Sequence, residues 1–173
     1  MTTTTRIRLA RAADIDYIFE IRTSVKENHL SLAELSERGI THEAIQNAIA
    51  SDDCIWMAEA EGVPVGFAMA DADEGSVFAV FVQPAWEGRG LGRLLMEKAE
   101  AFLFERHETI WLETDGRSRA SGFCTKLGWN SVRSYDNGDL RFEKRRNGET
   151  VPRPKNLIKA RPCPASKTEI NTG

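Results

Sequence analysis

Three glycines at alternate positions, Gly88, Gly90 and Gly92, lie between an apolar run and an amphipathic segment. The run over residues 77–82 is apolar at every position, which predicts a strand that is buried on both faces. Residues 91–106 place apolar side chains at helical spacing, which predicts an amphipathic helix. The first N–H groups of such a helix have no intrahelical acceptor and lie at the positive end of its dipole. The segment therefore predicts a loop that binds phosphate through backbone amides.

Two common phosphate-binding motifs do not fit this loop. A Walker loop requires Lys followed by Ser or Thr after its last glycine, but Arg93 and Leu94 follow Gly92. The dinucleotide pattern GxGxxG fails because Arg93 stands where its third glycine belongs. A glycine-rich turn without a ligand is the remaining alternative. We favour a ligand, because each glycine would weaken the helix start by roughly several tenths of a kcal/mol.

The rest of the chain alternates between strand and helix patterns. Helices are predicted from Asp14, over residues 44–49, over 91–106 and over 118–127, and residues 28–39 could hold a short helix. Strands are predicted over residues 6–9, 55–58, 65–69, 76–82 and 109–113. Two further strands should flank the Asn137-Gly138 turn, a strong hairpin signal.

The end of the chain has a different composition. Four of its six prolines, at positions 152, 154, 162 and 164, lie beyond residue 146 among Lys, Arg, Ser and Thr. Such spacing gives no apolar face that could pack. We therefore expect one domain over residues 1–146 and a disordered tail over 147–173.

Composition excludes several classes of function. The net charge of −3 gives no basic surface for nucleic acid and argues against binding to a membrane surface. No apolar run approaches the ~20 residues that span a bilayer, and the start lacks the order of a signal peptide. We expect a cytoplasmic protein. Cys54, Cys124 and Cys163 are too far apart to form a close metal or redox motif, so neither a structural metal nor a disulfide framework is expected.

Two segments resemble the GNAT superfamily of acetyltransferases. Val82-Gln83-Pro84 followed by residues 88–95 resembles the family's acetyl-CoA motif Q/R-x-x-G-x-G/A; Gly90 and Gly92 match it, whereas Glu87 occupies the Gln/Arg position. Residues 120–129 resemble the family's A-x-x-(L/F)-Y-x-K-x-G-F segment. The resemblance covers residues 6–144. It implies an α+β GNAT fold, with a central, mixed but mostly antiparallel twisted sheet of about seven strands flanked by about four helices.

The resemblance also implies a function. It implies an N-acetyltransferase that moves the acetyl group of acetyl-CoA to a small-molecule or peptide amine by direct attack in a ternary complex, without a metal. A homodimer is a possible assembly. The alternative is a regulatory module of the same fold that binds acyl-CoA with little or no catalysis.

The resemblance assigns binding roles to several residues. It places the pantetheine arm along the backbone of Phe81 and Val82, and the acceptor amine near Glu27 and Asn28. Arg117, Arg119 or Lys126 could contact the CoA phosphates, although each is equally plausible as a solvated surface charge. The loop that would hold the diphosphate consists of Gly88, Arg89, Gly90, Leu91, Gly92 and Arg93.

The proton donor is the clearest departure from the family pattern. Cys124 occupies the position of the usual tyrosine, four residues before Gly128. A thiol could donate a proton, since its reference pKa of ~8.5 is closer to neutrality than that of tyrosine. However, Cys124 shares a helical face with Ala120 and Leu127, so we favour a packing role. Tyr135 is an alternative donor if the fold brings it close.

For the general base, Glu113 at the end of its strand is one candidate. The cluster of Asp71, Asp73 and Glu74 is another, but acidic residues in turns more often stabilise the turn itself.

Overall fold

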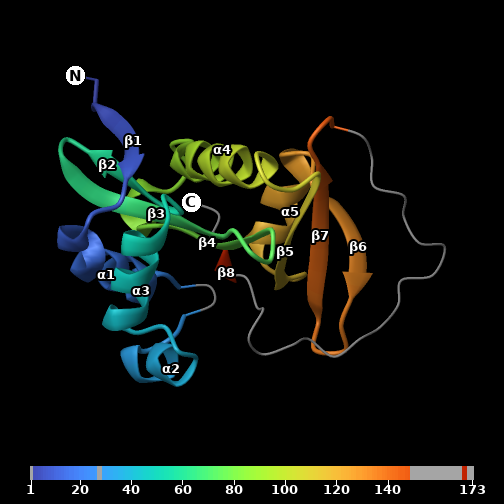
Figure 1. Ribbon diagram of the computed structural model, residues 1–173, viewed down its shortest axis with the longest axis horizontal. Coiled ribbons are helices and arrows are strands. Elements are labelled where there is room, and N and C mark those ends of the chain that lie inside the picture. The colour runs from blue at the N-terminus through green and yellow to red at the C-terminus, as the bar shows by residue number, and fades with distance from the viewer. Residues whose placement is uncertain (1, 27–28, 149–168, 171–173) are drawn as a thin grey trace.

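The computed structural model describes residues 2–26, 29–148 and 169–170 of the 173 residues. A mixed sheet runs through the molecule in the order β1-β2-β3-β4-β5-β7-β6, with β8 paired to β4 off this path (Figure 1). Neighbouring strands are antiparallel except where β4 meets β5 and β8. The strands are β1 Thr5–Leu9, β2 Ile55–Ala60, β3 Val63–Asp71, β4 Ser76–Val82, β5 Thr109–Asp115, β6 Asn130–Ser134, β7 Asp139–Arg145 and β8 Glu169–Ile170.

Helices cover both faces of this sheet. Figure 1 shows α1 and α3 on one side of the sheet and α4 on the other. The helices are α1 Ile15–Ser24, α2 Leu32–Glu37, α3 His42–Ser51, α4 Leu91–Phe104 and α5 Arg119–Lys126, with short 3₁₀ turns at Ala12–Asp14 and Pro84–Trp86. The predicted α+β fold with a mixed, mostly antiparallel sheet of about seven strands is thus confirmed; with the two-residue β8 the described sheet has eight strands. In the described ranges there are five α-helices rather than about four.

The additional helix, α2, has a local cause. The Ser31 hydroxyl accepts a hydrogen bond from the Glu34 amide at 3.2 Å, and the Glu34 carboxylate accepts one from the Ser31 amide at 2.8 Å. This reciprocal capping box satisfies amides that would otherwise lack a partner at the helix start. It allows a helix of only six residues to form between α1 and α3.

β4 and β5 diverge soon after they meet. They run parallel but pair at a single position, Ser76 with Trp111, whereas β5 pairs with β7 along its whole length. On the other side of β4, Met69 pairs with Ala79 and Ala70 with Val77. Residue 78 is therefore an extra residue, a β-bulge that bends and twists the strand. Beyond this point the edge of β4 that faces β5 is not paired with β5.

The core confirms the predicted character of β4 and α4. The side chains of Leu91, Leu95 and Leu103 on α4 are buried against the sheet. A Cβ atom at Gly66 on β3 would lie 2.9 Å from the Phe81 carbonyl oxygen and 3.3 Å from a methyl group of Leu95. Glycine at this position therefore lets α4 approach the strands closely. α4 begins directly after the glycine loop, so this packing also fixes the position of the loop.

The tail contributes to the sheet, which the sequence did not suggest. Glu169 and Ile170 form β8, which pairs in parallel with Ala79 and Val80 at the edge where β4 leaves β5. The sequence predicted no face in residues 147–173 that could pack, and the pairing of these two residues with β4 differs from that expectation. The division into a domain over 1–146 and a tail over 147–173 stays a prediction. A strand needs only unpaired backbone groups on a neighbouring edge, so an amphipathic pattern is not required for this contact. Residues 149–168 and 171–173 lie outside the described part.

None of the helices in the described ranges has the length and apolar character needed to cross a membrane.

Candidate functional site

The glycine loop follows β4 and leads into α4. Gly88 and Gly90 have φ angles of 74° and 82°, in the left-handed region that glycine adopts without strain. A Cβ atom at either residue would meet no protein atom within 4 Å. Protein packing therefore does not require glycine at these positions. The backbone conformation requires it, and the space in front of the loop is open to a ligand.

The first turn of α4 presents amides to this space. The first hydrogen bond of the helix runs from the Leu94 amide to the Gly90 carbonyl, at 3.2 Å. The amides of Leu91, Gly92 and Arg93 precede it and have no intrahelical acceptor. α4 is 14 residues long, so these amides lie at the positive end of a long helix dipole. The arrangement is suited to a phosphate or another anion.

The charged side chains around the loop include one acidic residue, Glu87, and it is paired. The Glu87 carboxylate pairs with the Arg119 guanidinium at 3.3 Å, which opposes the negative charge that Glu87 brings to the loop. The Arg89 guanidinium lies 4.5 Å from the centroid of the Trp86 ring. Of the three basic residues predicted to contact the CoA phosphates, the structure thus brings Arg119 to the loop.

The other two basic candidates lie elsewhere. Arg117 pairs with Asp115 at 3.1 Å and lies beside Gly138 of the β6–β7 turn. Its hydrogen bond to Asp115 raises the pKa of the guanidinium above its usual value. Lys126 is exposed at the last residue of α5, about 10 Å along the helix axis from Arg119 at its first residue. Their predicted contacts with CoA stay predictions.

Phe81 and Val82 end β4 just before the loop, and the side chains of both are fully buried. Any ligand beside them would have to contact their backbone. β8 pairs with β4 at the two preceding residues, Ala79 and Val80.

Glu113 lies where β4 and β5 separate. It is two residues beyond Trp111, the last position at which the two strands pair. Its side chain is only 2% exposed, yet within the described structure its Oε2 atom has no hydrogen-bond partner. Its Oε1 atom accepts a hydrogen bond from the Tyr135 hydroxyl at 2.5 Å. Burial, followed by this contact with the Glu113 carboxylate, raises the pKa of Tyr135 above its ordinary value.

Sequence reasoning weighed Glu113 and Tyr135 separately and missed their contact. Within the sequence, the one available signal was the Asn137-Gly138 turn. It returns the chain immediately after Tyr135 and so places β6 beside β7, which pairs with β5.

Cys124 lies on the opposite side of the sheet from Glu113. Its side chain is fully buried, and burial together with the nearby Glu100 carboxylate raises its pKa to about 12. Glu100 belongs to α4 and receives hydrogen bonds from Lys144 at 3.0 Å. Lys144 pairs with Ile110 on β5, and side chains alternate along a strand, so Glu113 points to the other face. These features favour the packing role for Cys124.

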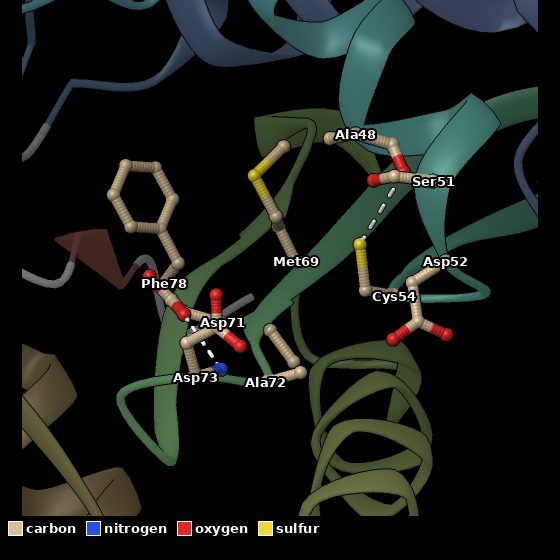
Figure 2. A pocket seen from close by; sticks show the side chains of 10 residues that line it. Ala48, Ser51, Asp52, Cys54, Met69, Asp71, Ala72, Asp73 and Phe78 are labelled. Carbon is tan, nitrogen blue, oxygen red and sulfur yellow. Dashed lines mark hydrogen bonds between the residues drawn. The ribbon is translucent and has the colours of Figure 1, made fainter.

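A cavity of about 430 Å³ lies at the opposite end of β4 from the glycine loop. Figure 2 shows it between the end of α3 and the β3–β4 turn, with Met69, Asp71 and Phe78 among its lining residues. Asp71 accepts hydrogen bonds from the amides of Asp73 and Glu74, both at 3.1 Å, as a turn-forming aspartate does. Neither Glu113 nor any loop residue lines this cavity, so it is distinct from the candidate phosphate site.

Glu27 and Asn28, the candidate acceptor-binding residues, are outside the described residues. Within the described ranges, no three His, Cys, Asp or Glu side chains converge in a way that could hold a metal ion.

Known proteins share this sequence pattern and fold. Residues 15–129 match the model of the acetyltransferase (GNAT) family. A ribosomal protein bS18–alanine N-acetyltransferase of Haemophilus influenzae is 34% identical over 71 residues, which cover 39% of this chain and 49% of that protein. An uncharacterized N-acetyltransferase of Archaeoglobus fulgidus is 30% identical over 98 residues, which cover 51% of this chain and 60% of that protein. The chain thus spans about half the length of these relatives.

A solved structure with the same fold is that of the PaiA N-acetyltransferase from Thermoplasma acidophilum in complex with coenzyme A. It aligns with a TM-score of 0.69 and 18% identity, covering 82% of this chain and 99% of that one. At this identity the likeness establishes the fold alone. The family model, in contrast, matches more than half of the sequence, and the chain therefore belongs to the acetyltransferase (GNAT) family.

Proposed function

We propose that this chain is an N-acetyltransferase that binds acetyl-CoA at the glycine loop and transfers its acetyl group directly to an amine in a ternary complex. The observation that carries the proposal is the open, amide-lined space at the start of α4, in front of Gly88 and Gly90. The names of the two sequence relatives support the reaction, and a structural neighbour crystallised with coenzyme A supports the ligand.

The residues present fit such a ligand. The free amides of Leu91, Gly92 and Arg93 would bind the diphosphate, and Arg89 and Arg119 lie in or beside the loop as compensating charges. The pantetheine arm would extend from the loop along the backbone of Phe81 and Val82. Because both of these side chains are buried, the contact would consist of backbone hydrogen bonds.

The reaction requires a group that accepts a proton from the amine. Bound acetyl-CoA would supply an activated acetyl group; the amine nitrogen bonds to the carbonyl carbon, the C–S bond breaks, and CoA leaves as the thiolate. Glu113 is the base in this proposal, because its Oε2 atom is buried and has no partner in the described structure. The amine proton would pass to this oxygen. The thiolate is stable enough to leave before solvent protonates it, so a dedicated acid is not required.

The acceptor is a small-molecule or peptide amine. The Haemophilus influenzae relative is named for the alanine of a ribosomal protein, which makes a peptide amine a reasonable first substrate to test. Glu27 and Asn28 stay the proposed acceptor contacts.

Ligand binding can be tested by thermal unfolding. At one hundred times its dissociation constant, acetyl-CoA should add about 2.7 kcal/mol to the free energy of unfolding. ATP and NAD at the same concentration serve as controls, because they carry phosphates without a pantetheine arm. An equal shift with all three would indicate a general anion site, and no shift with acetyl-CoA would contradict the proposal.

The second candidate function is a regulatory module that binds acyl-CoA without turnover. The buried Cys124 at the position of the family's tyrosine favours it, because a thiol with a pKa of about 12 is a poor proton donor at neutral pH.

Cys124→Ala tests whether this residue packs in the core or donates a proton to the leaving group. We expect a loss of about 1–2 kcal/mol in stability from the cavity, with turnover within about twofold of wild type. A hundredfold loss of turnover with unchanged acetyl-CoA binding would instead make Cys124 the acid.

The tail offers another prediction. Deleting residues 149–173 removes β8, which contributes only two paired positions to the edge of β4. We expect the melting temperature to fall by no more than about 5 °C, because the few hydrogen bonds lost contribute about 1 kcal/mol each. Acetyl-CoA should bind at least as tightly, since β8 lies next to the proposed pantetheine site. Calorimetric titration of both proteins would measure this, and weaker binding by the shortened chain would show that the tail supports the site.

A further inference from the structure

The hydrogen bond between Tyr135 and Glu113 joins two buried side chains that are 22 residues apart in the sequence. Tyr135 is 7% exposed and lies directly before the β6–β7 turn. Its backbone is held on both sides of that turn: its amide donates to the Asp139 carbonyl at 2.9 Å, and its carbonyl accepts from the Gly138 amide at 3.0 Å. Asn137 and Asp139 add two further hydrogen bonds within the turn. The hydroxyl of Tyr135 is therefore presented from a rigid support.

Arg141 is the residue opposite Glu113 on β7, but its guanidinium contacts other side chains. The guanidinium contacts the Glu143 carboxylate at 3.2 Å and lies 4.2 Å from the centroid of the Trp111 ring. Arg133 on β6 and Arg141 both act electrostatically on Tyr135 and favour its charged form. Tyr135 is thus the neutral hydrogen-bond donor that holds Glu113.

The two oxygens of Glu113 have different environments. Oε1 is occupied by the tyrosine hydroxyl, whereas Oε2 is buried and lacks a partner in the described structure. Buried polar atoms are nearly always paired, so this oxygen can still accept a hydrogen bond or a proton from another group. It lies where β4 and β5 separate, beside the strand that leads to the glycine loop.

We propose that Tyr135 is a positioning residue for Glu113: its hydroxyl holds Oε1, so that Oε2 is presented to the acceptor amine. The inference rests on the proposed function. When the amine attacks, its proton passes to Oε2, while Tyr135 keeps its own proton and continues to donate to Oε1. The raised pKa of Tyr135 agrees with a hydroxyl that stays protonated near neutral pH.

Turnover of single and double variants tests this role. Tyr135→Phe removes the hydroxyl and keeps the ring, and we expect kcat to fall about tenfold with KM for acetyl-CoA within about twofold of wild type. Tyr135 acts through Glu113, so the double variant Glu113→Gln/Tyr135→Phe should be no slower than Glu113→Gln alone, within about twofold. Tyr17→Phe is the matched control, because Tyr17 is the only other tyrosine of the chain and is 40% exposed on α1. Normal kcat in Tyr135→Phe, or losses that multiply in the double variant, would overturn the proposal.

A second measurement needs no activity. With tyrosine labelled at the ring carbon that bears the hydroxyl, NMR gives one signal for each of the two tyrosines, and Tyr135→Phe assigns them. Glu113→Gln should lower the pKa of Tyr135, because it removes the neighbouring negative charge. An unchanged titration would show that the contact is absent in solution and overturn the inference, even if acetyl-CoA binds and turns over. A wild-type protein that acetylates no amine would instead overturn the proposed function, while the titration would still decide whether the contact exists.

Discussion

Replacing Gly90 with aspartate is expected to abolish stabilisation by acetyl-CoA. The substitution places a side chain and a negative charge in the open space before α4, where the phosphates would bind. Wild type should gain about 2.7 kcal/mol at one hundred times the dissociation constant, whereas the variant should gain nothing measurable at the same concentration. Thermal unfolding with and without ligand measures both values.

Gly39 provides a matched control for the backbone. Its φ angle of 79° is close to the 82° of Gly90, and a Cβ atom there would also meet nothing within 4 Å. Gly39 follows α2, away from the loop. Gly39→Asp and Gly90→Asp should therefore cost similar strain in the free protein, about 1 kcal/mol each. Only Gly90→Asp should lose the ligand response. If both variants respond like wild type, the loop does not bind the phosphates.

Glu113→Gln is expected to lower kcat by about 10²–10⁴-fold, the usual effect of losing a general base. The amide has nearly the same shape as the carboxylate but cannot accept a proton from the amine. Acetyl-CoA binding should be unchanged, because Glu113 lies outside the glycine loop. Steady-state kinetics over a range of amine concentrations, together with calorimetric titration of acetyl-CoA, would separate the two effects.

Glu100→Gln is the control for a buried carboxylate. Glu100 lies on α4, where it accepts hydrogen bonds from Lys144 and from Trp129 at 2.8 Å, on the face of the sheet opposite Glu113. Its replacement should reduce stability and leave kcat within a few-fold of wild type. Equal losses of kcat in both variants would indicate a general structural effect and remove Glu113 from the mechanism.

The sequence predicted those parts of the site that depend on local pattern. The apolar run of β4, the helical spacing of α4 and the glycines between them lie within about thirty consecutive residues, and each follows from backbone rules that act over a few positions. The packing face of α5, which includes Cys124, was also readable from helical spacing. In the same way, the hairpin at Asn137-Gly138 followed from turn chemistry alone.

Other parts of the site depend on strand register and could not be predicted. The contact between Tyr135 and Glu113 requires β6 to pair with β7, and β7 with β5, each at one specific register. The divergence of β4 from β5 coincides with a bulge at residue 78, inside a run whose uniform apolar character does not mark the position of an extra residue. The pair of Glu87 and Arg119 joins two segments 32 residues apart. The capping box of α2, in contrast, was present in the sequence as Ser31 and Glu34.

The most direct test of the central claim is the amine-dependent release of CoA from acetyl-CoA. Purified full-length protein would be incubated with acetyl-CoA and a panel of small amines, amino acids and peptides with free N-termini, and free thiol and product mass would be recorded. We predict that at least one amine accelerates thiol release and gains about 42 Da, because an acetyl group replaces one hydrogen. Gly90→Asp should abolish both signals, and Glu113→Gln should reduce them by about 10²–10⁴-fold. Tight binding of acetyl-CoA with no acetylated product across the panel would contradict the account and favour the regulatory module.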